Sequence, residues 1–143
     1  MKWQKQEYRY MLINEVFTEL IMIAEEDLRS AKILANDYKP PIEISCYHCQ
    51  QCAEKSLKAY LSFHYIKHKF THDLDVLCSD CQQIDQGFLQ LSSECKVLND
   101  YIKQTRYTKK YDLTEFNMRQ AIEHAEKILE FVKAKTAPDG ESR

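Results

Sequence analysis

The sequence predicts an all-α fold, an up-and-down bundle of about five helices. Three observations lead to this prediction. Only two of the 143 residues are glycine and three are proline, so residues that interrupt helices are scarce. Lys, Glu, Gln, Leu and Ala, which favour helices, are abundant. Apolar residues recur at intervals of three and four over long stretches, as they do on the buried side of a helix.

The first two helices are expected over residues 12–37 and 42–67, separated by Pro40-Pro41. Asp27 lies on or beside the apolar stripe of the first helix, and we expect it to pair with a base, Lys55 or Arg106. The second helix carries apolar residues on two sides, which indicates a central position between neighbours.

The other three helices follow from caps and apolar spacing. A short third helix begins after the cap Thr71-His72-Asp73 and ends near Gln86-Gly87. The fourth helix carries apolar residues between 88 and 102, and the pattern Asp112-x-x-Glu115 opens the last. The expected organisation is an N-terminal helical extension (1–19), one helical domain (20–135) and a disordered tail (136–143).

Charge and composition exclude several classes of function. The net charge is −2, so any attraction to nucleic acid must be local. No run of about 18 apolar residues occurs and the N-terminus lacks an apolar signal core, which predicts a cytoplasmic protein with no membrane partner. The two glycines are too few for a glycine-rich phosphate loop, which excludes P-loop and Rossmann nucleotide sites.

The cysteines allow two interpretations. Residues 46–52 read CYHCQQC, and a second CxxC pair occurs at Cys78 and Cys81, so four thiolates for zinc can be drawn. Neither pair has the adjacent glycine or turn residues of a zinc knuckle, and Cys46 and Cys49 coincide with the apolar phase of a helix. Because buried free cysteine behaves as a small apolar residue, packing is the favoured interpretation, with no metal site and no cofactor.

Four segments together resemble the HEPN domain family. The stretch YHCQQCAEKSLKAYL resembles the family's Q-x-x-E-K-x-L-K-A helix, and AEEDLRSA at 24–31 resembles its A-x-x-D-L-x-x-A. Thr71 to Leu74 and Leu98 to Tyr107 resemble two further family segments, in the same order. The resemblance covers about residues 20–135. It implies a helical homodimer in which the fourth-helix arginine lies near the two-fold interface, and it places the cysteines where the family commonly carries alanine.

The resemblance also implies an activity. Many HEPN proteins are metal-independent endoribonucleases with the motif R-x-x-x-x-H, in which arginine binds the scissile phosphate and histidine transfers a proton. Arg106 matches the arginine here, but Tyr111 stands at the histidine position. A tyrosine with a pKa of about 10 is a poor base at neutral pH. The catalytic candidates are therefore Arg106 and Tyr111, with His72 as a replacement for the missing histidine.

Binding depends less on the missing histidine. Between residues 96 and 111 there are five basic residues and one acid, with tyrosines interleaved. Basic groups hold phosphates and aromatic rings stack on bases, so the sequence predicts contact with a nucleotide or single-stranded RNA. The candidate residues are Arg106, Tyr107, Lys109, Lys110, Lys103 and Tyr101. The alternative is a solvated helix end with its tyrosines in a dimer contact. We expect Asp27, Glu54 and Lys55 to form a structural ion network.

Three functions remain open from the sequence. The first is a nucleotide- or RNA-binding HEPN protein that serves a minimal nucleotidyltransferase as its substrate-binding or toxin-like partner, because stand-alone HEPN domains are often encoded beside such enzymes in toxin–antitoxin-like pairs. In that arrangement Tyr107 or Tyr111 could accept a nucleotidyl group. The second is a metal-independent endoribonuclease, and the third is a non-catalytic protein-interaction module.

Overall fold

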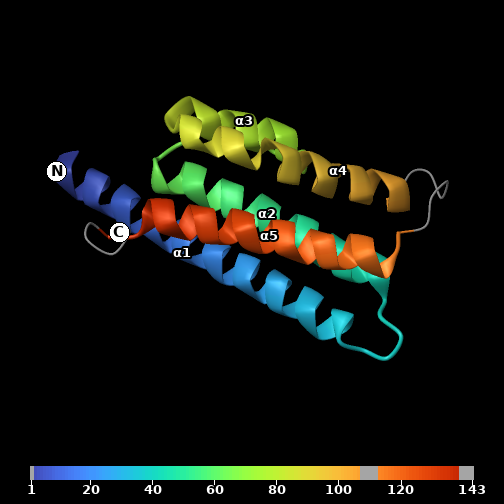
Figure 1. Ribbon diagram of the computed structural model, residues 1–143. Coiled ribbons are helices and arrows are strands. Elements are labelled where there is room, and N and C mark those ends of the chain that lie inside the picture. The colour runs from blue at the N-terminus through green and yellow to red at the C-terminus, as the bar shows by residue number, and fades with distance from the viewer. Residues whose placement is uncertain (1, 107–112, 139–143) are drawn as a thin grey trace.

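The computed structural model describes residues 2–106 and 113–138, and these form an all-α bundle (Figure 1). Its helices are α1 (Lys2–Ala35), α2 (Ile42–Phe63), α3 (Leu74–Ile84), α4 (Ser92–Arg106) and α5 (Glu115–Thr136), with a 3-10 helix, η1 (Gln86–Leu91), before α4. These two ranges contain no strand. The predicted fold class and the predicted number of helices are confirmed.

The second helix is central, as its two apolar sides indicated. It contacts α1, α3, α4 and α5. The helices α1 and α5 pack on one side of α2, and the pair α3 and α4 packs on the other (Figure 1). Burial on both sides explains why most of α2 between Ser45 and Ser62 is buried.

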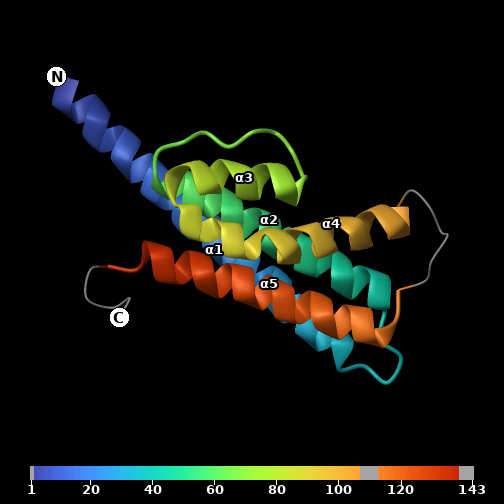
Figure 2. The same ribbon diagram turned by 45° about the horizontal axis from the view of Figure 1, so that its top comes forward.

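Consecutive helices alternate in direction except for α2 and α3, which run the same way because residues 64–73 return along the bundle (Figure 2). Two contacts establish this arrangement. Gln50, in the first half of α2, binds the carbonyl of His72 just before α3. Farther along both helices, the thiol of Cys81 donates to the carbonyl of Leu57 over 3.6 Å. The beginning of α3 therefore lies beside the first half of α2.

Two helix ends differ from the sequence prediction. Helix α1 begins at Lys2 instead of residue 12, so residues 2–19 continue directly into the bundle helix. Helix α2 ends at Phe63 instead of residue 67, and Tyr65 has a φ of 63°, in the left-handed region that a helix does not continue through. His64 and His68, four positions apart, therefore do not lie on one face of a helix.

The caps of α3 and α5 set where these helices start. Asp73 caps α3 as predicted, accepting from the backbone amides of Asp75 and Val76. Helix α5 opens with a capping box between Thr114 and Asn117, in which each side chain accepts from the other's backbone amide. The expected box at Asp112-x-x-Glu115 is wrong, because Thr114 and Asn117 take the two capping positions and Glu115 is the first residue of the helix. Asp112 itself lies outside the described residues.

All six cysteines are buried free thiols in the core, which confirms the packing interpretation. Burial raises the pKa of the Cys46 and Cys52 thiols to about 12, so both remain protonated at neutral pH. Within residues 2–106 and 113–138, no three His, Cys, Asp or Glu side chains are grouped to hold a metal ion. None of the helices described is long and apolar enough to cross a lipid bilayer.

Candidate functional site

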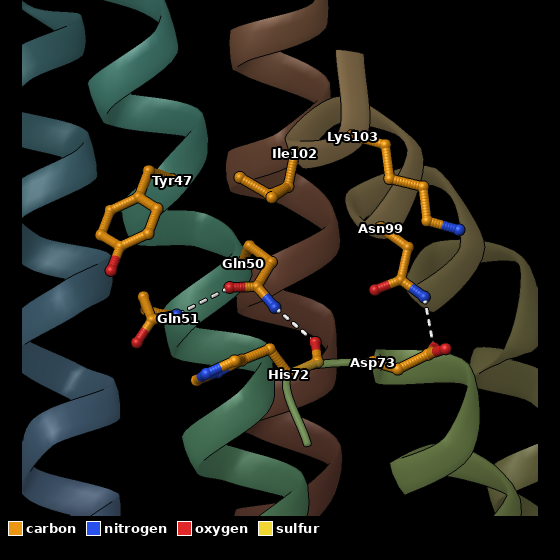
Figure 3. Close-up of a pocket in the computed structure, with 8 residues that line it drawn as sticks. All are labelled: Tyr47, Gln50, Gln51, His72, Asp73, Asn99, Ile102 and Lys103. Atoms are coloured by element: carbon orange, nitrogen blue, oxygen red, sulfur yellow. Dashed lines mark hydrogen bonds between the residues drawn. The ribbon is translucent and has the colours of Figure 1, made fainter. Parts of the chain in front are cut away.

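A pocket of about 270 Å³ opens between α2, the start of α3 and the second half of α4 (Figure 3). Three elements supply its lining: α2 contributes one aromatic ring and two amides, the segment before α3 contributes an imidazole and a carboxylate, and α4 contributes an amide, an aliphatic chain and a cation. The lining residues are Tyr47, Gln50, Gln51, His72, Asp73, Asn99, Ile102 and Lys103.

Two glutamines of α2 hold the segment that precedes α3. Gln50 is buried, and its Nε2 donates to the backbone carbonyl of His72 over 2.9 Å. Gln51 Nε2 donates in turn to Gln50 Oε1 over 2.8 Å, which fixes the orientation of the Gln50 amide. Figure 3 shows this chain of amides running from α2 to His72 along one wall of the pocket.

Asp73 and Asn99 join α3 to α4 on the opposite wall (Figure 3). Asn99 Nδ2 donates to Asp73 Oδ1 over 2.8 Å, while Asn99 Oδ1 accepts from the Leu74 amide over 3.0 Å. Burial alone would raise the pKa of Asp73, but the hydrogen bonds from Asn99 and from the first-turn amides outweigh it and hold the pKa below its ordinary value. The carboxylate in the pocket is thus ionised, and its Oδ1 is bonded to α3 and α4.

A buried ion cluster lies behind the pocket, centred on the completely buried Glu54. Glu54 Oε2 accepts from Lys58 over 3.0 Å and from Lys55 over 3.4 Å, and Oε1 lies 2.8 Å from His72 Nδ1. Burial acts to raise the pKa of Glu54, but the hydrogen bonds from His72 and Lys58 outweigh it and lower the pKa. The network predicted for Glu54 and Lys55 is present, with Lys58 and His72 as further members.

The hydrogen bond with Glu54 fixes the orientation of the His72 imidazole at the pocket. Because an ionised carboxylate only accepts hydrogen bonds, His72 Nδ1 carries a proton and donates a hydrogen bond to Glu54. The opposite ring nitrogen, Nε2, points away from Glu54 and carries the lone pair when the imidazole is neutral. The imidazole side chain is 83% exposed, so it remains accessible to a ligand. A buried carboxylate that orients a histidine in this way is typical of proton-transfer sites.

Asp27 is not part of this network. Its Oδ1 lies 2.9 Å from His48 Nδ1, and this pair links α1 to α2. Of the partners expected from the sequence, Lys55 instead reaches Glu54 on its own helix. The other, Arg106, ends α4, which packs on the other side of α2, and its side chain lies outside the described residues.

Tyr101 also has a different role from the predicted one. Its ring is buried, its hydroxyl donates to Gln120 on α5 and the same hydroxyl accepts from Asn117 Nδ2 over 3.2 Å. A ring held between α4 and α5 cannot stack on a base. We therefore assign Tyr101 to the packing of the bundle instead of nucleotide contact.

The remaining predicted site residues lie at or beyond the end of α4. Lys103 is exposed and lines the pocket. Arg106 is the last residue of α4, three positions farther along the helix. The side chain of Arg106 and all of Tyr107, Lys109, Lys110 and Tyr111 lie outside the part of the chain that the structure describes.

Sequence reasoning missed most of the pocket lining. Tyr47, Gln50 and Gln51 lie in the very stretch that carries the cysteines, and Asn99 follows the buried Leu98. The available signal was polar amides inside otherwise apolar helix faces, since buried amides require specific partners. That signal identifies Gln50 and Asn99, both buried, but it does not reveal that they face one pocket.

Comparisons with known proteins agree with the fold and with the segments described. The HEPN domain family matches residues 17–135. Among solved structures, the chain is similar to ST0689, an archaeal HEPN homologue, with a TM-score of 0.69 and 26% identity over 85% of this chain and 98% of that one. It is equally similar to TT1696 from Thermus thermophilus, with a TM-score of 0.69 and 26% identity over 83% of this chain and 97% of that one. A search of curated proteins gave no match. Because the family match spans most of its length, the chain belongs to the HEPN domain family.

Proposed function

We propose that this HEPN chain binds a nucleotide or single-stranded RNA in the pocket between α2, α3 and α4. The observation that carries the proposal is the lining itself, which combines an aromatic ring (Tyr47), primary amides and an exposed cation (Lys103) within one concave site. Aromatic rings stack on bases, amides bond to base edges, and lysine attracts phosphate.

The amides and the lysine of the lining favour a neutral or anionic ligand. The Oδ1 atom of the ionised Asp73 carboxylate already accepts hydrogen bonds from Asn99 and from the first-turn amides of α3, so this oxygen is engaged within the protein. Each primary amide has two N–H groups, so Gln50 and Asn99 can hold the pocket walls and still offer a second donor. Lys103 is followed three residues later by Arg106 on the same helix, so positive charge continues along α4 from the pocket.

A titration with fluorescently labelled single-stranded RNA tests the proposal. Lys103→Gln should raise Kd about tenfold, which corresponds to ~1.4 kcal/mol, near the size of one charge-assisted contact. Lys96→Gln is the matched control, because Lys96 is also an exposed lysine of α4 but does not line the pocket. The affinity should fall as salt rises. Equal affinities for the two variants, or no binding by the unmodified chain, would contradict the proposal.

A second candidate function is metal-independent RNA cleavage, and the Glu54–His72 pair is the observation that favours it. With Nδ1 held by Glu54, His72 Nε2 could accept the proton of an attacking 2′-hydroxyl, in place of the histidine that Tyr111 replaces. Cleavage of single-stranded RNA in the presence of a chelator, lost in both His72→Asn and Arg106→Ala, would support this function. Cleavage retained equally by both variants would identify a contaminating nuclease.

The partners belong to the same proposal. A HEPN chain of this kind would act as a homodimer and serve a minimal nucleotidyltransferase, offering it a bound nucleotide or RNA. Co-purification of such an enzyme with the tagged chain is the expected result. If the chain instead is a pure protein-interaction module, binding of its protein partner should be insensitive to salt and to Lys103→Gln, because it would depend on apolar contacts.

A further inference from the structure

The first part of α1 extends beyond the bundle (Figures 1 and 2). Residues 2–16 precede the segment that matches the HEPN family, which begins at residue 17. Phe17 packs against Phe63 of α2 with ring centroids 5.2 Å apart, at the point where α1 meets the bundle. Helix propensity alone stabilises a helical segment of about 15 residues only marginally in water, so a contact along one of its faces would stabilise this extension.

A second apolar face runs along α1 across this junction. Leu12, Val16 and Ile23 are exposed by 41%, 42% and 40%, and their spacing of four and seven residues places them on one side of the helix. The inward side of α1 is different and carries Ala24, Leu28 and Ala31, all buried against the bundle. We call Leu12, Val16 and Ile23 the α1 stripe. An apolar stripe that the described chain leaves partly exposed is a candidate contact for another molecule.

The charges on either side of the α1 stripe indicate what that molecule is. Residues 2–9 carry Lys2, Lys5 and Arg9 against one acid, Glu7. Residues 12–28 contain no lysine or arginine and carry five acids, namely Glu15, Glu19, Glu25, Glu26 and Asp27. A helix with a basic first part and an acidic second part is complementary to a copy of itself laid antiparallel, whereas parallel copies would place like charges level.

We propose that α1 of a second copy of this chain packs antiparallel on the α1 stripe, with a two-fold axis near residue 14. In that register Leu12 of each copy lies level with Val16 of the other, and residues 2–9 lie level with residues 19–26. The contact would extend over ~37 Å of helix at 1.5 Å per residue. The extension and the Arg106 end of α4 lie at opposite ends of the bundle, so this contact leaves the nucleotide pocket of both copies open (Figure 1).

Replacing the apolar stripe tests the contact. Leu12→Gln with Val16→Gln keeps good helix formers at exposed positions, so the domain should stay folded while the measured mass falls, by twofold if α1 is the only contact between copies. Met22→Gln is the control, because Met22 is 62% exposed one residue before Ile23 and lies on another side of α1. Light scattering during size exclusion gives the mass, and circular dichroism checks helicity. Equal masses for the unmodified chain and the double variant would overturn the proposal.

A charge exchange tests the antiparallel register. Arg9→Glu alone and Glu19→Arg alone should each weaken the association, because each places like charges level between the copies. The two substitutions together should restore the mass of the unmodified chain, since the pair is only reversed in sign. A doubly substituted chain that associates no better than either single variant would overturn the antiparallel arrangement. If a separate two-fold contact at the Arg106 end also forms, loss of the α1 contact still lowers the mass, from a larger assembly to a dimer.

Discussion

At the scale of single residues, Glu54 connects the core to the pocket. A fully buried carboxylate is costly unless hydrogen bonds and opposite charges offset its desolvation, and Lys58, Lys55 and His72 provide them. The carboxylate also holds His72, whose backbone carbonyl is held by Gln50. One buried charge therefore fixes the segment that forms a pocket wall.

Glu54→Gln should destabilise the chain by about 3 kcal/mol, because it leaves the largely buried Lys58 ammonium without its counter-ion. Urea unfolding followed by circular dichroism measures the effect. Glu26→Gln is the control, since Glu26 pairs with Arg29 at 3.6 Å with both side chains mostly exposed. That substitution should cost less than about 1 kcal/mol. Similar losses for the two variants would mean that the cluster does not support the fold.

The buried cysteines give a second prediction at this scale. All six thiols are buried and free, so iodoacetamide at neutral pH should add no mass to the native chain and six adducts after unfolding in urea. Intact-mass spectrometry distinguishes the two states. Rapid labelling of any cysteine in the native chain would show that the thiol is open to solvent and not part of the core.

Residue identity predicted that Asp27 and Glu54 need partners, but not which groups they meet. Asp27 illustrates the limit, because an acid beside an apolar stripe needs a partner, and the partner is His48 on another helix. Tyr101 is the opposite case. A tyrosine among basic residues suggested base stacking, but its hydroxyl bonds to residues of α5. Which side chains pair depends on how each helix is oriented about its own axis relative to its neighbours. The apolar periodicity of the sequence does not determine that orientation.

At the scale of elements, the start of α3 connects the pocket to the bundle. Asp73 caps the helix and also binds Asn99 of α4, so one carboxylate sets both where α3 begins and how it sits against α4. The cap was predictable from Asp73 before an apolar run. The contact with Asn99 was not, because the two residues are 26 positions apart.

Asp73→Ala should lower stability by about 1–2 kcal/mol and also weaken RNA binding, because the cap and the pocket wall are lost together. Thr114→Ala removes the cap of α5, so it should cost about 1 kcal/mol and leave binding unchanged. Urea unfolding and RNA titration of both variants separate the two effects. Binding that is lost equally in both variants would show that affinity follows global stability and not the pocket.

The helix ends show what sequence patterns determine. Proline marked the break between α1 and α2 correctly, since it fixes φ and lacks a backbone donor. The end of α2 was placed too late because apolar residues continue through Ile66, while the backbone leaves the helix at Tyr65 with a positive φ. The start of α1 was placed too late because residues 2–11 lack the regular spacing used to define the helix.

At the scale of the whole molecule, four acids should make stability depend on pH. The pKa values of Glu54, Asp73, Asp85 and Glu94 are lowered in the folded chain, in each case by hydrogen bonds from neighbouring donors. The unfolded chain therefore binds protons first as the pH falls, and the stability these groups provide is present above about pH 4.5 and lost below it. Burial lowers the pKa of His124, which adds a smaller loss of stability as the pH falls through about 6.5.

Unfolding free energies measured in urea from pH 8 to pH 3 check this dependence. The expected curve declines gently through pH 6.5 and steeply below about 4.5. Glu54→Gln should flatten the steep part, because the substituted amide does not titrate. A stability that rises between pH 5 and pH 3 would contradict the sign of these pKa shifts.

The fold was easier to predict than the site for a physical reason. Helices arise from local propensity and periodic burial, which the sequence of α2 and α5 displays directly. The pocket arises from side chains on three elements separated by up to 56 positions, from Tyr47 to Lys103, and only the packing of those elements brings them together. The family resemblance identified the segments that carry the fold and pointed to Arg106 as a site residue. It did not point to the amides of α2.

Nuclear magnetic resonance offers the most direct test that this pocket binds a nucleotide or RNA. In a titration of isotopically labelled protein with short single-stranded RNA, the side-chain amide signals of Gln50, Gln51 and Asn99 should shift together with the backbone signals of His72 and Lys103. The shifts should saturate with one common affinity, and Lys103→Gln should need about tenfold more RNA to reach the same shifts. Shifts that are absent, or that occur only away from these residues, would contradict the assignment of the pocket.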